Sequence, residues 1–191
     1  MEIQPLKLQG TYEIILNPSR DERGYFMRTF DEKIFNDYGL TSEWKQENQS
    51  FSQKQGLIRG LHFQLPPYTE TKLVRVTLGS IWDVFVDLRI DSKTYGQWDK
   101  IELASDNFKM IYIPKGFAHG FCTLTDMALV QYKVDAYYNL QYEGGIRWDD
   151  ETLQIPWPAK MPFLSDKDRE LPSFNSFISP FVVAPQISSA S

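Results

Sequence analysis

Short runs in which polar and apolar residues alternate are the feature that most limits what this chain can fold into. Three clear runs are 81–88, 108–113 and 129–134, and turn residues such as Gly79 and 114–116 separate them. A repeat of two residues is that of a β-strand, whose successive side chains point to opposite faces. Many short strands punctuated by turns are typical of an antiparallel sandwich or barrel. The sequence therefore predicts an all-β protein.

Helical signals are sparse. The clearest helix is expected from Asp31, a suitable N-cap residue, to Tyr38, with Gly39 as its stop signal. From about residue 155 onward, prolines interrupt the pattern and predict an irregular or short-helical C-terminal wrap. Residues 187–191 are expected to be frayed because they are small, polar and terminal.

Composition and charge narrow the class of protein. Aromatic residues make up 15% and charged residues 24% of the chain, as in a globular protein. The net charge is −5, and without a basic run to neutralise phosphates a nucleic-acid partner is not expected. A small anionic ligand held by a few arginines is compatible with this charge.

Location is predicted from three absences in the sequence. Cys122 is the only cysteine, so the chain carries no disulfide framework. No apolar run approaches the ~20 residues of a membrane span. Residues 1–6 lack the basic and apolar regions of a signal peptide. We therefore expect a cytoplasmic protein with no membrane partner.

The chain has two histidines, and each lies in a run of aromatic, glycine and apolar residues. His62 lies in 59–64 and His119 in 114–121. A histidine titrates near neutral pH, which makes both candidates for proton transfer or ligand binding. The alternative is a core histidine that is hydrogen-bonded to a backbone carbonyl.

Residues 58–76 are predicted to form a hairpin centred on Pro67. His62 and Lys72 would then lie opposite each other, because each is five residues from that proline. A histidine and a lysine on one interior wall cost free energy unless an anion or an oxyanion uses them. The alternative is that Lys72 points to solvent.

Strict alternation places Arg59 and His62 on opposite faces of their strand. If both line one pocket, Gly60 is the expected site of a β-bulge. Arg59 and Arg23 are candidates for clamping a phosphate, and each can equally be a surface charge. Taken alone, Tyr132 is predicted to be a core aromatic residue, and Asp168 is predicted to lie in a solvated charged turn.

Several common catalytic architectures are absent from the sequence. Two histidines cannot supply the three-histidine set of a metal cupin, and one cysteine cannot replace it, so we expect no metal. Dinucleotide-binding, P-loop and nucleophile-elbow motifs are also missing, and no cofactor is predicted.

Taken together, the segments from about residue 18 to residue 172 resemble the dTDP-4-dehydrorhamnose 3,5-epimerases, a family of metal-free cupins. Their order and spacing make the resemblance specific. The segments that carry it are 21–26, 46–50, 59–64, 72–74, 83–89, 116–121, 132–133, 145–150, 155–158 and 164–168. The resemblance implies a single cupin-type antiparallel jelly roll over residues 1–191, with a few short helices.

The resemblance also implies roles for individual residues. His62 matches a general base, Asp168 the carboxylate that orients it, Lys72 a cation near the ketone oxygen, and Tyr132 the acid on the opposite face of the sugar. Groups matching contacts to the nucleotide and the rest of the substrate are Arg23, Arg59, His119, Gln46, Asn48, Glu143 and Lys167.

The implied activity is epimerisation of a nucleotide-activated 4-keto-6-deoxyhexose at C3 and C5, by a homodimer in which strands cross between subunits. The chain departs from the family pattern at Arg28, where glutamate is usual, at Glu70, where glutamine is common, and at Glu151, where proline is frequent. Arg28 is predicted to bind the substrate. Because arginine stands there in place of glutamate, the sequence does not determine which nucleotide the substrate carries. The alternatives are a C3-only epimerase, another nucleotide, and a non-catalytic nucleotide-sugar-binding jelly roll.

Overall fold

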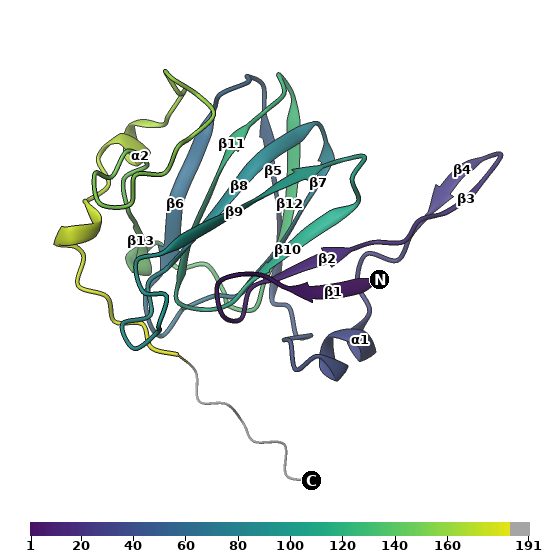
Figure 1. Cartoon of the computed structure of the whole chain (residues 1–191), viewed down its shortest axis with the longest axis horizontal. Helices are drawn as coiled ribbons and strands as arrows, with labels where there is room; N and C mark the ends of the chain where they lie inside the picture. The colour runs from purple at the N-terminus through teal and green to yellow at the C-terminus, as the bar shows by residue number, and fades with distance from the viewer. Residues whose placement is uncertain (184–191) are drawn as a thin grey trace, which may run out of the picture.

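The structure, a computed structural model, describes residues 1–183, and the predicted frayed end at 187–191 lies outside them. Two antiparallel sheets face each other (Figure 1). The six-stranded sheet has the order β1 (Glu2–Pro5), β2 (Tyr12–Ile15), β10 (Lys109–Ile113), β7 (Lys72–Leu78), β12 (Ala128–Val134) and β5 (Gln46–Ser52). The five-stranded sheet has the order β13 (Glu143–Gly145), β6 (Ile58–Gln64), β11 (Phe117–Thr123), β8 (Ser80–Asp87) and β9 (Trp98–Ala104).

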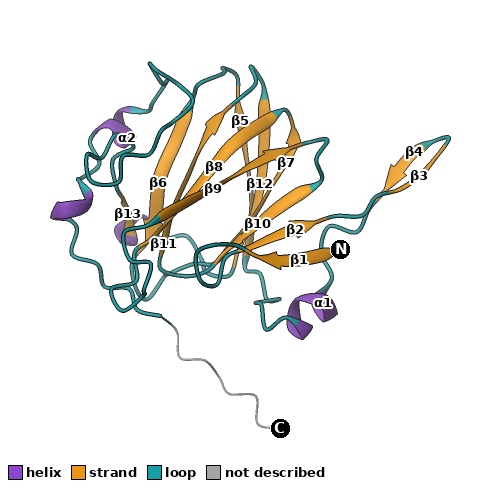
Figure 2. Ribbon diagram, in the orientation of Figure 1, coloured by secondary structure: helices purple, strands orange, loops and turns teal. Residues whose placement is uncertain are grey.

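The remaining elements are short (Figure 2). They are the ribbon of β3 (Ser19–Asp21) and β4 (Gly24–Phe26), the helices α1 (Glu32–Asp37) and α2 (Asp166–Arg169), and the 3-10 helices η1 (Leu140–Tyr142) and η2 (Phe174–Ser176). The all-β jelly-roll prediction with a few short helices is therefore confirmed. The helix expected from Asp31 is also confirmed, because the Asp31 side chain accepts a hydrogen bond from the Ile34 N–H and Gly39 follows the helix end.

Apolar side chains fill three layers. Between the sheets lie residues such as Phe85 and Val130, while Val84 and Val86 pack outward under the C-terminal segment. On the outer face of the six-stranded sheet, Phe35 of α1 packs with other apolar side chains. Burial on both faces explains why strands such as β8 carry apolar residues on both of their faces, as at Val84, Phe85 and Val86.

The hairpin predicted for residues 58–76 is wrong. The strands β6 and β7 belong to different sheets, so the turn at Pro67 crosses from one sheet to the other. His62 is paired with His119 and Gly145, not with Lys72. Both side chains nevertheless face the interior, since each lines the cavity between the sheets.

The bulge predicted at Gly60 is confirmed. His62 pairs with His119 and Arg59 pairs with Phe121, so β6 has two residues between these pairs where β11 has one. Gly60 has a φ of +123°, and a Cβ there would lie 2.6 Å from the Gly120 Cα. Only glycine allows this close approach of the two strands. The bulge brings Arg59 and His62 into one cavity, although strict alternation would place them on opposite faces.

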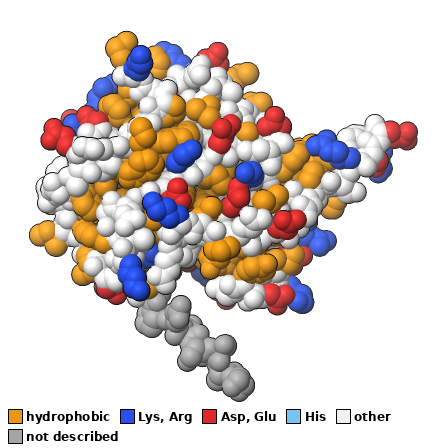
Figure 3. Space-filling model, viewed as in Figure 1, with side chains coloured by type: hydrophobic (Ala, Val, Ile, Leu, Met, Phe, Trp, Pro, Cys, Tyr) orange, Lys and Arg blue, Asp and Glu red, His pale blue; other side chains and the backbone are white. Residues whose placement is uncertain are grey.

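The β3–β4 ribbon projects from the rest of the molecule as an arm (Figure 1). Tyr25 and Phe26 on this arm are 51% and 73% exposed. Positive and negative side chains are interspersed over the face in Figure 3, which also shows the charged tip of the arm. In the part of the chain described here, no helix has the length and apolar character needed to cross a membrane.

Candidate active site

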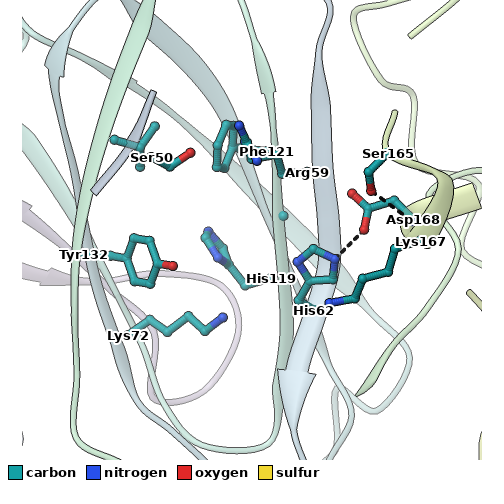
Figure 4. A pocket seen from close by; sticks show the side chains of 12 residues that line it. Ser50, Arg59, His62, Lys72, His119, Phe121, Tyr132, Ser165, Lys167 and Asp168 are labelled. Atoms are coloured by element: carbon teal, nitrogen blue, oxygen red, sulfur yellow. Dashed lines mark hydrogen bonds and ion pairs between the residues drawn. The ribbon is translucent and has the colours of Figure 1, made fainter. Parts of the chain in front are cut away.

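The cavity between the two sheets has a volume of about 290 Å³. Its wall carries most of the polar side chains singled out from the sequence, and Figure 4 shows how they converge. The lining residues are Ser50, Arg59, His62, Lys72, His119, Gly120, Phe121, Val130, Tyr132, Ser165, Lys167 and Asp168. A second hollow of about 280 Å³ shares His62, Lys72 and Tyr132 with the first, so the two form one continuous site.

His62 and Asp168 form a hydrogen-bonded pair at one wall. The His62 Nε2 lies 2.6 Å from the Asp168 Oδ1, and the Gly60 N–H donates to the other carboxylate oxygen over 3.4 Å. Asp168 lies on α2, which is capped by the Ser165 hydroxyl accepting from the Asp168 N–H. The carboxylate is 5% exposed and the imidazole 28% exposed. The imidazole therefore opens to the cavity while its partner is shielded.

The Asp168 carboxyl stays ionised. Burial by itself raises its pKa, but the hydrogen bond and charge of His62, the Gly60 N–H and the Ser165 side chain together hold the pKa below its ordinary value. An ionised carboxylate fixes the imidazole through Nε2. The ring nitrogen left for proton transfer is therefore Nδ1.

Tyr132 lies across the cavity from His62. It projects from β12 in the six-stranded sheet, and its hydroxyl points toward the imidazole (Figure 4). Burial raises the pKa of Tyr132, as do the charges of Glu70 and Glu143, while the Arg59 charge opposes them. The hydroxyl consequently holds its proton at neutral pH, as a proton donor must.

Lys72 projects into the space between these two groups from β7 (Figure 4). Its side chain is 11% exposed, and its Nζ lies 3.2 Å from the Glu70 Oε1. The interior position predicted for Lys72 is therefore confirmed, and the solvent-facing alternative is wrong. A nearly buried ammonium at a cavity wall is suited to stabilising a negative oxygen.

A second imidazole–carboxylate pair lies behind the first. The His119 Nε2 lies 2.8 Å from the Asp83 Oδ2, and the Asp83 side chain is fully buried. Burial raises the pKa of this carboxyl, although His119 and Lys72 act in the opposite direction. The other oxygen, Oδ1, is buried without a partner among the described residues.

The other predicted contact residues divide into two groups. Those brought to the joined cavities are Arg59, His119, Gln46, Asn48, Glu143 and Lys167. Lys167 forms an ion pair with Glu143 Oε1. Arg23 instead lies on the arm beside Asp21, and Arg28 lines a hollow on the outer face of the six-stranded sheet, paired with Asp31. Within one chain, neither arginine reaches the cavity.

Sequence reasoning missed Ser50 and Asp83 as parts of the site. The Ser50 Oγ is buried without a partner among the described residues, and the side chain lines the cavity. Its signal was the alternation in β5, which places Ser50 on the same face as Gln46 and Asn48. Asp83 had a similar signal, because it shares a strand face with the buried Phe85.

The fold and the cavity define a cupin-type jelly roll that carries ionisable side chains on opposite walls of an interior cavity. Within residues 1–183, no group of three or more His, Cys, Asp or Glu side chains is arranged to hold a metal ion. The sequence profile of the dTDP-4-dehydrorhamnose 3,5-epimerase family matches residues 5–176. The chain belongs to this family, whose members are isomerases.

Individual relatives agree with the family match. The dTDP-4-dehydrorhamnose 3,5-epimerase of Shigella flexneri is 47% identical over 149 residues, which is 78% of this chain and 82% of that protein. The Bacillus anthracis enzyme, solved with TDP and PPi bound, superposes with a TM-score of 0.88 at 44% identity, covering 90% of this chain and 98% of that one. The Legionella pneumophila enzyme, solved with dTDP-4-keto-L-rhamnose, gives a TM-score of 0.90 at 38% identity, covering 96% and 99%.

Proposed function

We propose that the chain converts dTDP-4-dehydro-6-deoxy-D-glucose to dTDP-4-dehydro-L-rhamnose by inversion at C3 and C5. The observation that carries the proposal is the placement of His62 and Tyr132 on opposite walls, with Lys72 between them (Figure 4). Inversion next to a ketone removes a proton from one face of the sugar and returns one to the other face. Two proton-transfer groups across a cavity meet that requirement.

His62 Nδ1 takes the proton from the carbon next to the C4 ketone. The electron pair of the broken C–H bond moves into the ring, and the ketone oxygen becomes the negative oxygen of an enolate. The Lys72 ammonium stabilises that oxygen, and the ionised Asp168 stabilises the imidazolium that has formed. Before the reaction, Lys72 and Asp168 thus already carry charges opposite to those that develop on the ketone oxygen and on His62.

Tyr132 then gives its proton to the same carbon from the opposite face. The high pKa of the buried phenol suits a donor to the strongly basic carbon of an enolate. His62 afterwards releases its proton and Tyr132 regains one, which resets the site for the second carbon. Because the lysine supplies the positive charge, this proposal includes no metal and no cofactor.

The proposal includes a nucleotide-sugar ligand held by Arg59, His119, Gln46, Asn48, Glu143 and Lys167, which border the reacting groups. It also includes a cytoplasmic location, which the single cysteine supports. The non-catalytic alternative is not favoured, since the base, its carboxylate, the acid and the lysine are all present and converge.

The proposal further includes a homodimer. The arm carries exposed aromatic side chains and places Arg23 beyond the reach of its own cavity. A second copy that covers the arm would bury Tyr25 and Phe26 and give Arg23 an anionic ligand in the partner's cavity. Light scattering at micromolar concentration should give the mass of a dimer, and an active monomer would contradict this part of the proposal.

The reaction is tested by proton NMR of dTDP-4-keto-6-deoxyglucose in D2O with the purified protein. We expect deuterium to enter at C3 and at C5 and the L-rhamno product to form. Exchange and inversion at C3 alone would identify a monoepimerase. Binding of the nucleotide sugar with no exchange at either carbon would identify a non-catalytic binding protein and overturn the proposal.

A further inference from the structure

Glu70, one partner of a nearly buried ion pair at the cavity wall, has no part in the chemistry above. The Glu70 Oε1 lies 3.2 Å from the Lys72 Nζ, and the two side chains are 12% and 11% exposed. Glutamate and lysine are rarely buried, because taking a charge out of water costs free energy unless it is paired. The pair therefore marks a position at which the fold holds an ammonium in nearly dry surroundings.

Glu70 is itself held by the opposite sheet. Gln64, at the end of β6, donates from its Nε2 to the Glu70 Oε2 over 3.0 Å. The Gln64 side chain is 3% exposed, and its Oε1 accepts from the Asn139 N–H over 2.7 Å. Because both ends of the amide are engaged, one carboxylate oxygen of Glu70 is anchored and the other is directed at Lys72.

Lys72 also lies near a second carboxylate. The charge of Lys72 acts, with that of His119, against the effect of burial, which raises the pKa of Asp83. The Asp83 Oδ1 is buried without a partner among the described residues. An ammonium on a four-carbon stem, if released by Glu70, would have this oxygen as a competing position away from the substrate.

We propose that Glu70 is a positioning residue that holds the Lys72 ammonium at the place where the substrate ketone arrives. The inference rests on the proposed function, which assigns Lys72 to the enolate oxygen. A cation fixed before the reaction stabilises the enolate without reorganising. The carboxylate offsets part of the positive charge, but position outweighs this loss, since a misplacement of ~1 Å can cost ~10²-fold in rate.

Glu70 also affects Tyr132. Burial raises the pKa of Tyr132, the Glu70 charge raises it further, and the charges of Arg59 and Glu143 act in opposite directions. The other charged and titratable groups around the same cavities are His62, Lys72, His119, Lys167, Asp168 and Tyr138. Neutralising Glu70 should therefore lower the pKa of Tyr132 and move the alkaline limb of the activity profile to lower pH.

The first test compares Glu70→Gln with Glu70→Asp, and with Glu13→Gln as a matched control. Glu13 Oε1 pairs with Lys109 Nζ over 2.7 Å and lines neither cavity. With dTDP-4-keto-6-deoxyglucose at pH 7, Glu70→Gln should lower kcat by about tenfold with little change in KM. Its alkaline limb should move to lower pH. Glu70→Asp should lower kcat and leave the limb in place, and the control should change neither.

A double-mutant cycle tests whether Glu70 acts through Lys72. Deuterium exchange at pH 7 is compared in Lys72→Met with and without Glu70→Gln. If Glu70 only positions Lys72, the second substitution should change the exchange rate by less than about twofold. Equal losses from Glu70→Gln in both backgrounds would overturn the proposal.

Nitrogen NMR of the lysine side chains gives a measurement that needs no turnover. The Lys72 Nζ resonance should shift in Glu70→Gln and stay in place in Glu13→Gln. An unshifted Lys72 resonance overturns the positioning role, whatever happens to kcat. Failure of the wild-type protein to exchange C3 or C5 would instead overturn the proposed function, so the two failures are distinguishable.

Discussion

The two imidazole–carboxylate pairs of this molecule have the same chemistry and different surroundings. His62 Nε2 lies 2.6 Å from Asp168 Oδ1, and His119 Nε2 lies 2.8 Å from Asp83 Oδ2. The first imidazole is 28% exposed and the second 10% exposed. A short imidazole–carboxylate hydrogen bond therefore does not by itself decide which histidine transfers protons.

The carboxylates differ more than the imidazoles. Hydrogen bonds hold the pKa of Asp168 below its ordinary value despite burial, whereas burial raises the pKa of Asp83, one oxygen of which has no partner within residues 1–183. The Asp168 carboxylate, with its lowered pKa, is the better suited of the two to stabilise an imidazolium after proton transfer. Hydrogen bonding of the carboxylate and access of the ring to the cavity are therefore the two differences that favour His62 over His119 as the proposed base.

The largest expected effect is the difference between His62→Asn and His119→Asn. The first removes the base and should lower the exchange rate by ~10²–10⁴-fold. The second should cost much less, because the proposed function gives His119 a contact to the substrate and no proton transfer from carbon. NMR exchange rates measure both, and calorimetric titration with dTDP should show nearly intact binding in His62→Asn. Equal losses in both variants would contradict the assignment.

Tyr132→Phe tests the acid that faces the first pair. It leaves His62 and Lys72 in place, so deuterium should still exchange at C3, while completed inversion should fall by about 10²-fold or more. Parallel measurement of deuterium incorporation and product stereochemistry separates the two steps. If both fall equally, Tyr132 positions the substrate and is not the acid.

Asp168→Asn and Asp83→Asn compare the two carboxylates directly. Asp168→Asn removes the charge that stabilises the imidazolium, and we expect kcat to fall by roughly 10- to 100-fold, as for groups that orient a reacting side chain. Asp83→Asn replaces a carboxyl whose pKa is already raised, so kcat should change by less than about threefold. Steady-state kinetics at pH 7 decides, and a reversed order would break the comparison.

The smallest effect concerns stability against pH. The folded-state pKa of Asp168 is below 3.8, so its stabilisation is present above that pH and is lost as pH falls. The folded-state pKa of Asp83 is above 3.8, so its contribution is largest at low pH and is lost as pH rises. At pH 7, Asp168→Asn should cost about 1.5–3 kcal/mol of unfolding free energy.

Urea unfolding between pH 3 and pH 7 gives the measurement. The loss of unfolding free energy in Asp168→Asn should shrink toward pH 3. The unfolding free energy of Asp83→Asn should rise relative to that of the wild-type protein as pH rises. Parallel pH profiles for the two variants would show that the surroundings of the carboxylates do not differ as described.

Much of the fold was predictable because strand signals are local. The alternation in residues 81–88 correctly placed Val84 and Phe85 on opposite faces, and the conflict between Arg59 and His62 correctly located a bulge at Gly60. The pairing of strands was not predictable in this way. A turn at Pro67 looks the same whether it closes a hairpin or crosses between sheets.

The site was predictable where a side chain sits on a strand and less so where burial depends on distant segments. Asp168 lies among charged residues, which by themselves indicate a solvated turn, and it is buried only because the C-terminal segment packs against β6. The family resemblance supplied its role. That Arg23 and Arg28 contact the substrate stays a prediction, since neither reaches the cavity of its own chain. The sequence of one chain carries no local signal for a contact made between two chains.

The attachment of Asp168 to the C-terminal wrap has a consequence for how the protein is made. Every named strand ends by Gly145, so the ribosome has released both sheets before residue 168 emerges. A nascent or C-terminally clipped jelly roll would already carry His62, Tyr132 and Lys72, but the His62 imidazole would lack its hydrogen bond to Asp168. A segment synthesised after every named strand of the two sheets is thus the one that completes the site, and its loss should lower kcat at least as far as Asp168→Asn does.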